Sequence, residues 1–113
     1  MKHIVAVIQP ARLMPVRESL VNAGITGMTV AEVRGFGQQG GITDTYRGVE
    51  YTVEFVPKIR VDVVVSADLL ETAVKAIKEG ARTGKIGDGK IFVSDVEAVH
   101  RIRTEDMNEA ALR

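Results

Sequence analysis

The sequence contains no cysteine, few aromatic residues and no excess of charge of either sign. Without cysteine, disulfides, thiol catalysis and thiolate metal sites are excluded together, and the chain fits a reducing compartment. Lys and Arg number 15 and Asp and Glu also number 15, so there is no overall basic footprint for nucleic acid. Aromatic residues make up 4% of the chain. That is too few for the base-stacking platform of an RNA recognition motif.

Long apolar runs are also absent. The run at the N-terminus, Ile4–Ile8, ends at Gln9 and Pro10, and it is too short for a signal-peptide core or a membrane span. We therefore expect a cytoplasmic protein that does not bind nucleic acid. With 113 residues, of which 45% are apolar and 27% charged, the chain has the size and balance of a single globular domain, 1–113.

Hydrophobic periodicity predicts four strands and two helices in the order β-α-β-β-α-β. Strands are indicated by a continuous apolar run or by apolar residues with a period of two, and helices by a period near 3.6. Gly24 is expected to end the first helix, and Asp68 with Glu71 to form a capping box at the second. The predicted strands are 4–8, 28–36, 58–65 and 91–96, and the predicted helices are 11–23 and 68–81.

This order is typical of the ferredoxin-like α+β sandwich, in which both helices cover one face of a four-stranded antiparallel sheet. Val5, Val7 and Val64 are expected on the other face, where a solvated sheet would carry polar residues. We therefore expect that face to be buried between the subunits of a homo-oligomer.

The connection between the second and third predicted strands, Gly35–Lys58, is much longer than a turn requires. Most connections have about 4–6 residues, and those beyond roughly 12–15 are usually functional or disordered. It contains Tyr46, Arg47 and Tyr51. We interpret it as a long flexible loop that presents polar groups to partners; a tolerated surface insertion is the alternative.

A glycine-rich basic segment, Thr83–Lys90, precedes the last predicted strand. Closely spaced glycines allow backbone N–H groups to converge on an anion, and Lys85 and Lys90 add positive charge. It is not a Walker A loop, because Ile86 stands where Ser or Thr would bind magnesium. The alternative is a turn that happens to be basic.

Arg101 and Arg103 lie in a segment, His100–Arg103, that is expected to be extended. In a strand both guanidinium groups would leave the same face and could grip neighbouring phosphates bidentately. The alternative is a solvated basic edge.

Other polar residues are ambiguous on their own. Lys58 opens a predicted strand and could pair with a ligand carboxylate or remain solvated, and Gln39 could bind a hard cation or form loop surface. His3 and His100 are interpreted as structural or surface residues. No Ser-His-Asp set or acid–base carboxylate pair is visible, so we do not expect an enzyme.

Two motifs together resemble the PII nitrogen-regulatory signal transduction proteins, the GlnB/GlnK family, and the likeness covers essentially the whole chain. The segment Tyr46–Tyr51, YRGVEY, resembles the family's uridylylation motif, in which Tyr51 would be the modified residue. The segment Thr83–Val93, TGKIGDGKIFV, with the later Arg101 and Arg103, resembles its C-terminal signature.

The resemblance implies a ferredoxin-like homotrimer whose clefts between subunits bind ATP or ADP and, with Mg²⁺ and ATP, 2-oxoglutarate. It implies a T-loop at about 37–55, a B-loop at about 82–90 and a C-terminal loop at about 102–113. The nucleotide would be held by Thr29, Gly37, Gln38, Gly87, Asp88, Gly89, Lys90, Arg101 and Arg103. The 2-oxoglutarate would be held by Gln39, Lys58 and Gly87, with Gln39 also completing the Mg²⁺ shell.

The resemblance also implies partners that recognise the T-loop conformation. These are an ammonium transporter at the inner membrane face, whose pore Arg47 would enter, and enzymes of nitrogen assimilation. A nucleotidyltransferase acting on Tyr51 is a further expected partner.

Four positions depart from the family pattern. Gln38 replaces a common Arg, Gly40 a common Lys, Val49 the usual Ala or Ser, and Glu105 a frequent Gly. We therefore expect weaker or altered nucleotide discrimination. The alternatives are an adenylate-only sensor without a 2-oxoglutarate response, an acyl-phosphate hydrolase on the same fold, and a trimeric scaffold of the copper-tolerance type.

Overall fold

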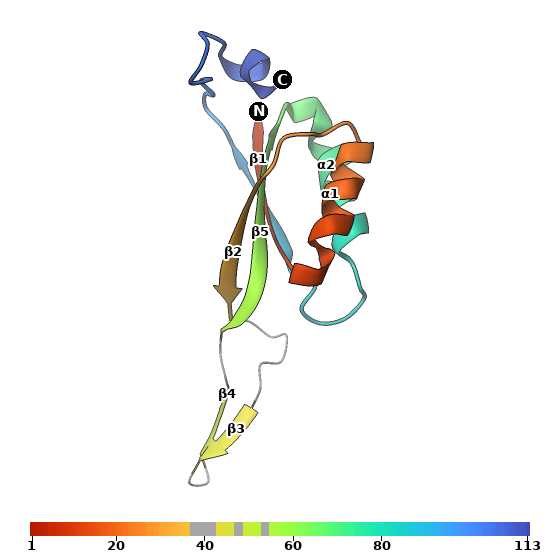
Figure 1. The fold of residues 1–113 in the computed structure, drawn as a ribbon, viewed down its shortest axis with the longest axis vertical. Coiled ribbons are helices and arrows are strands. Elements are labelled where there is room, and N and C mark those ends of the chain that lie inside the picture. Colours follow the sequence, from red (N-terminus) through yellow and green to blue (C-terminus); the bar gives the residue numbers. More distant parts are fainter. Residues whose placement is uncertain (37–42, 47–48, 53–54) are drawn as a thin grey trace.

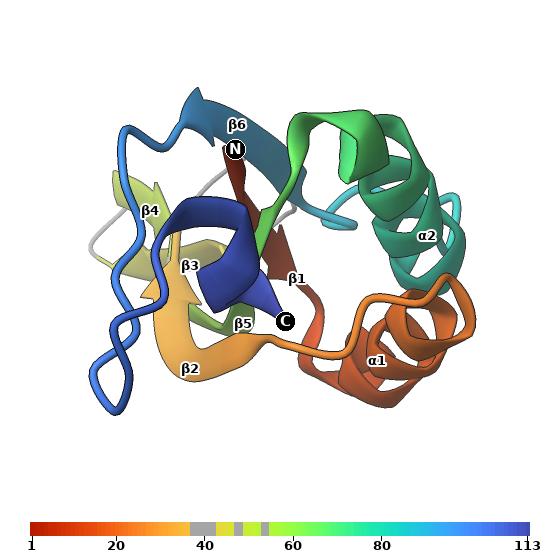
Figure 2. The ribbon, with the colours of Figure 1, turned by 90° about the horizontal axis from the view of Figure 1, so that it is seen from above.

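A four-stranded antiparallel sheet with the strand order β2-β5-β1-β6 forms one layer of the molecule, and two helices cover one of its faces (Figures 1 and 2). The computed structural model describes residues 1–36, 43–46, 49–52 and 55–113, with side chains for 1–36 and 55–113. The sheet strands are β1 (Lys2–Ile8), β2 (Thr29–Gly35), β5 (Val56–Val65) and β6 (Lys90–Asp95), and the helices are α1 (Leu13–Asn22) and α2 (Leu70–Ala81).

This arrangement confirms the predicted α+β ferredoxin-like fold. All six predicted elements exist, and each of their ends lies within two residues of the predicted one. The long connection contains two short antiparallel strands that periodicity did not indicate, β3 (Thr43–Tyr46) and β4 (Val49–Thr52), which form a separate two-stranded sheet. The expected long loop therefore carries regular structure.

The hydrophobic core lies between the sheet and the helices. Alternate residues of β1 and β5 face the helices because side chains in a strand alternate between faces; Ile4 of β1 lies opposite Val63 of β5 and Val93 of β6. The buried sheet residues include Ile4, Ala6, Ile8, Val61, Val63 and Val65, and the buried helix residues include Val16, Leu20, Ala73, Ala76, Ile77 and Ala81.

Gly80 allows α1 and α2 to approach closely. A methyl group there would lie 2.6 Å from the Cα atom of Val16 and 2.9 Å from the carbonyl oxygen of Pro15. Both atoms belong to the backbone of α1, so neither can rotate away. The absence of a side chain at this one position therefore sets the spacing between the helices.

The predicted capping box at α2 is wrong. A short 3₁₀ turn, Ala67–Leu69, precedes the helix, so Asp68 lies before the first helical residue, Leu70. No side chain caps either the turn or the helix. The 3₁₀ turn instead supplies a backbone bond, from the N–H of Leu69 to the carbonyl of Ser66, which is the other common way to begin a helix.

The sheet face away from the helices is partly apolar, as expected. Val5, Val7 and Val64 are half-buried in the single chain. The same face holds an ionic cluster, in which Arg60 donates two hydrogen bonds to Asp62 and the Nε2 atom of His3 lies 2.7 Å from that carboxylate.

The partner of His3 was not foreseen from the sequence. The hydrogen bond from Arg60 is the main cause that lowers the pKa of Asp62.

Within the described ranges, no helix is both long and apolar enough to cross a membrane.

Replacing Gly80 by alanine tests the helix spacing. We expect Gly80→Ala to lower the free energy of unfolding by about 1–3 kcal/mol through overpacking, although alanine gains roughly 0.5–1 kcal/mol over glycine in a helix. Urea denaturation at one fixed protein concentration measures the change. Gly27→Ala is the control, because its methyl group would meet nothing within 4 Å, and it should stay within about 0.5 kcal/mol of the wild type. A more stable Gly80→Ala protein would contradict this account.

Candidate functional site

The glycine-rich loop between α2 and β6 has a fixed shape. Gly84, Gly87 and Gly89 all have positive φ angles, of 86°, 104° and 102°, which residues with side chains rarely adopt. A Cβ atom at Gly89 would lie 1.7 Å from the carbonyl oxygen of Val7. The loop backbone is therefore pressed against the end of β1, and glycine is required there for two separate reasons.

The carboxylate of Asp88 holds the loop from inside. It accepts hydrogen bonds from the N–H groups of Thr83, at 2.8 Å, and Gly84, at 2.9 Å, and from the hydroxyl of Thr83. The Thr83 side chain is the main cause that lowers the pKa of Asp88, and the two N–H groups add to it. In this conformation Asp88 organises the loop, and a direct contact with a nucleotide stays a prediction.

The carbonyl oxygen of Gly87 joins this loop to two strands. It accepts a hydrogen bond from the Nζ atom of Lys58 at 2.8 Å and another from the Nε2 atom of Gln9 at 2.7 Å. Lys58 is only 5% exposed, and its burial lowers the pKa of its ammonium group. The alternative interpretation of Lys58 as a solvated strand end is therefore wrong.

Gln9 was missed from the sequence. It directly follows the apolar strand β1 and precedes Pro10, so it was used only to mark the end of that strand. A polar residue at the end of a buried strand predicts little about its contacts. The hydrogen-bond partner of Gln9, the carbonyl of Gly87, is far away in the sequence.

A cavity of about 300 Å³ lies beside the loop. Its lining contains apolar side chains and more positive than negative ones. The apolar lining comes from Ile8, Ile77, Ala81 and Ile91, and the charged lining from Lys78, Arg82, Asp88 and Lys90. This end of the sheet thus offers concentrated positive charge although the whole chain has none in excess.

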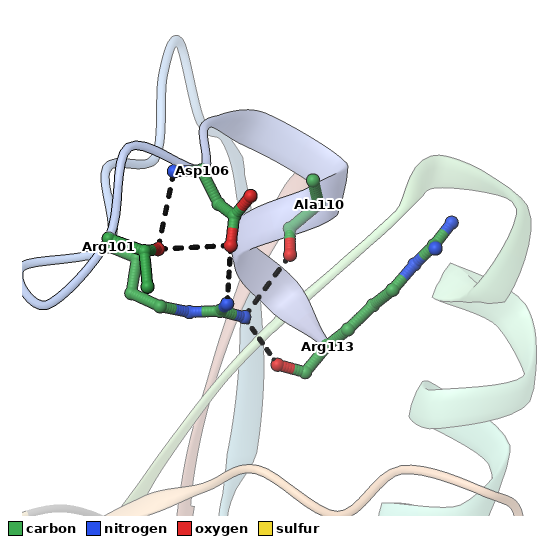
Figure 3. Close-up of polar contacts among 5 residues, drawn as sticks. Arg101, Asp106, Ala110 and Arg113 are labelled. Atoms are coloured by element: carbon green, nitrogen blue, oxygen red, sulfur yellow. Dashed lines mark hydrogen bonds and ion pairs between the residues drawn. The ribbon is translucent and has the colours of Figure 1, made fainter.

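Arg101 and Arg103 do not form the predicted extended segment, and that prediction is wrong. Within the described C-terminal residues, strand pairing near Arg101 is limited to one isolated β-bridge between His100 and Met107. Arg101 instead turns toward the chain that follows it, and donates to the Oδ2 atom of Asp106 at 2.7 Å (Figure 3). Arg103 is exposed. The two guanidinium groups therefore do not project from one face of a strand.

The predicted phosphate ligands fall into two groups at opposite ends of the sheet. Lys90 begins β6, opposite Val7, whereas Arg101 follows the far end of that strand. The six residues of β6 span on the order of 20 Å at about 3.3 Å per residue. Figure 1 shows the same separation, with the C-terminal segment beside the N-terminus and the glycine-rich loop at the other end of the helices. One chain does not bring these groups together.

Thr29 lies between the two groups. It begins the edge strand β2 opposite Asp62, so it shares the sheet face that the helices leave uncovered, and it is exposed. An exposed threonine at this position can contact a molecule that lies against that face.

Several predicted site residues lie outside the described residues: Gly37, Gln38, Gln39 and Arg47. Tyr51 lies on β4 opposite Asp44, but its side chain is not among those described. In the described part of the chain, no group of three or more His, Asp or Glu side chains is placed to hold a metal ion. The role predicted for Gln39 therefore stays a prediction.

Comparison with known proteins gives one consistent result. The family model for nitrogen regulatory protein P-II matches residues 1–106. The chain is 58% identical to the nitrogen regulatory protein P-II of Pasteurella multocida and 55% identical to P-II 1 of Escherichia coli K12. Each match covers 99% of this chain and all of the relative, and both relatives are named as regulatory proteins.

A solved structure agrees with the sequence matches. The Arabidopsis thaliana PII protein bound to citrate superposes with a TM-score of 0.78 at 39% identity, over 96% of this chain and 85% of the plant chain.

A pair of glycine substitutions tests the loop geometry. Gly84→Ala introduces only the positive φ strain, roughly 1–2 kcal/mol, because its methyl group meets nothing within 4 Å. Gly89→Ala adds the collision with Val7. We expect it to lower the free energy of unfolding by about 1–3 kcal/mol more than Gly84→Ala does. Urea denaturation of both variants measures the difference, and equal losses would mean that the contact with β1 does not constrain the loop.

Proposed function

Because the chain belongs to the nitrogen regulatory protein P-II family, we propose that it is a signal transduction protein that senses nitrogen, carbon and energy status. It binds ATP or ADP and, together with Mg²⁺ and ATP, 2-oxoglutarate. It then controls ammonium transporters and nitrogen-assimilation enzymes through the conformation of its T-loop. The observation that carries this proposal is the family match over nearly the whole chain.

The nucleotide site lies between subunits of a homotrimer. One subunit supplies the loop with Gly87, Gly89 and Lys90, and its neighbour supplies Arg101 and Arg103. The separation of these groups within one chain supports this arrangement. So does the half-buried apolar sheet face, which a neighbouring subunit would cover.

Thr29 of the second subunit lies near the adenine, and Gly37, Gln38 and Asp88 complete the nucleotide site. A cyclic assembly repeats this contact between every pair of neighbours.

The 2-oxoglutarate site lies at the base of the T-loop, and Lys58, Gln39 and Gly87 hold the ligand there. Lys58 is buried, and among the described residues its ammonium group is held by a neutral carbonyl, so a ligand carboxylate is a stronger partner. Gln39 also completes the Mg²⁺ shell. The plant relative is bound to citrate, which is likewise a small carboxylate.

The T-loop, about 37–55, responds because its base belongs to the same site. Gly35, at the end of β2, pairs with Val56, two residues before Lys58. A ligand shifts the loop between conformations only as far as its affinities for them differ.

The loop's conformation decides whether Arg47 enters the transporter pore at the membrane and whether enzymes of nitrogen assimilation bind. A nucleotidyl group on Tyr51 changes the choice of partner. The protein works in the cytoplasm and is not itself an enzyme.

Calorimetric titration tests the sensor. We expect ATP to bind in the presence of Mg²⁺, and 2-oxoglutarate to bind only to the loaded protein. Lys58→Met should weaken 2-oxoglutarate binding about 10- to 100-fold, since a charged hydrogen bond contributes about 1.5–3 kcal/mol. The control is Lys85→Met, which removes an exposed lysine from the neighbouring loop. This variant should bind 2-oxoglutarate as tightly as the wild type.

Two other outcomes would change the proposal. ATP binding without a 2-oxoglutarate response would indicate an adenylate-only sensor, altered by Gln38 and Gly40. Absence of both would contradict the sensor and favour a trimeric scaffold.

Mixing two inactive variants tests whether the site is shared. We expect Lys90→Gln and Arg101→Gln to abolish ATP binding separately. When they are unfolded and refolded together in equal amounts, about a quarter of the sites should regain both residues from neighbouring subunits. The control mixture of Arg101→Gln with Arg103→Gln should regain none, because both arginines belong to the same half-site. A site formed within one chain would give no recovery in either mixture.

A further inference from the structure

The guanidinium group of Arg101 makes three hydrogen bonds within its own chain, at the place where a phosphate would bind. Its Nη1 atom donates to Asp106, and its Nη2 atom donates to the main-chain oxygens of Ala110, at 3.2 Å, and Arg113, at 2.5 Å (Figure 3). A phosphate is gripped bidentately along one edge of the guanidinium plane, and both edges include Nη2. With both Nη2 hydrogens in use, neither edge is open.

Asp106 is held in position for this contact. Its Oδ2 atom also accepts a hydrogen bond from the hydroxyl of Thr104 at 3.0 Å, and that hydroxyl in turn accepts one from the N–H of Asp106 at 3.3 Å. The backbone adds a further bond, from the N–H of Arg101 to the carbonyl oxygen of Asp106, at 3.1 Å. Arg101 and Asp106 are thus joined through both main chain and side chains.

The rest of the C-terminal segment, residues 104–113, is docked on the body of the protein. Asn108 exchanges hydrogen bonds with Val99, through its N–H at 2.8 Å and its side-chain oxygen at 3.2 Å. Glu109, Leu112 and Arg113 line a cavity of about 480 Å³ together with residues 24–27 and the end of β5. The segment is therefore held against the body of the protein at more than one point along its length.

We propose that Asp106 is an internal competitor for the phosphate site, so that a polyphosphate binds at Arg101 only when the C-terminal segment is displaced. This rests on the proposed function, in which Arg101 contacts phosphate. Asp106 sets the affinity threshold without touching the nucleotide. The side chains of Arg101 and Asp106 are 25% and 46% exposed, and an ion pair so open to water is weak enough to be exchanged for a more highly charged ligand.

The first test compares the affinity of Asp106→Asn for ATP with that of the wild type. We expect it to bind ATP about 1.5- to fivefold more tightly, the range that a partly exposed ion pair supports. The gain should be smaller for AMP, which has fewer phosphates. Glu105→Gln is the matched control: it removes the same charge from the next residue, and among the described residues Glu105 forms no hydrogen bond or ion pair. All titrations are made near 0.15 M salt, where the Debye length is about 8 Å.

The second test uses the wild-type protein, so it does not depend on the folding of a variant. ATP should speed hydrogen exchange at the amides of Asp106 and Asn108, because binding at one place and release of the segment are reciprocal. Slower or unchanged exchange would overturn the proposal. So would an Asp106→Asn variant that binds ATP no more tightly than Glu105→Gln.

The outcomes separate the two levels of inference. Equal ATP binding by wild type and both variants rejects the competitor but retains the nucleotide sensor. Failure of all three to bind ATP rejects both. If only Asp106→Asn binds ATP, Asp106 competes strongly enough to prevent ATP binding in the wild type.

Discussion

The hydrogen bond between the Lys58 ammonium and the Gly87 carbonyl is the contact on which the rest of this end of the molecule depends. A buried ammonium group is strongly unfavourable unless it is hydrogen-bonded. Lys58 is therefore held against the glycine-rich loop for as long as it stays buried. Gln9 binds the same carbonyl, so the ends of β1 and β5 and the loop meet at a single oxygen atom. The base of the long connection, directly before Lys58, is fixed by the same contact.

This junction lies at one end of the sheet, whereas Arg101 follows the other end of β6. The two therefore cannot meet within one chain. Strand β6 separates Lys90 from Arg101 and cannot be shortened without losing its pairing with β1. A phosphate site that uses both must therefore be assembled from two copies. The uncovered sheet face, with half-buried valines around Asp62, is the surface on which such copies would meet. Oligomerisation and ligand binding then become a single structural requirement.

The sequence predicted what depends on local pattern and failed where distant residues decide. Alternating valines placed β5, and Gly24 marked the end of α1, because strand pleat and left-handed glycine are local properties. The capping box at Asp68 failed because a 3₁₀ turn, in which Leu69 and Leu70 donate to Ser66 and Ala67, begins the helix instead. The extended segment at Arg101 failed because Asp106, five residues later, offered that side chain a better partner than a strand edge would.

The candidate site shows the same division. The loop from Thr83 to Lys90 was identified because its glycine spacing and its charge are local features of the sequence. The hydrogen bonds of Asp88 within the loop depend on how the loop backbone turns. The hydrogen bond from Gln9 depends on which strand lies beside the loop. Periodicity carries no information on either. The strands β3 and β4 were missed for a related reason, since four-residue strands are too short to establish a period.

A chain without net charge can offer an anion site by arranging its charges unevenly and by giving the cations of that site partners that an anion can replace. Lys58 donates to a neutral carbonyl and Arg101 to Asp106, and Lys78, Arg82 and Lys90 line the same cavity as the carboxylate of Asp88. Binding of an anion is then an exchange of partners, and its free energy is the difference between two sets of contacts. Such differences are small and easily changed by one residue. Replacement of a single internal partner can therefore adjust affinity while the fold, which is held by the apolar layer between sheet and helices, is unaffected.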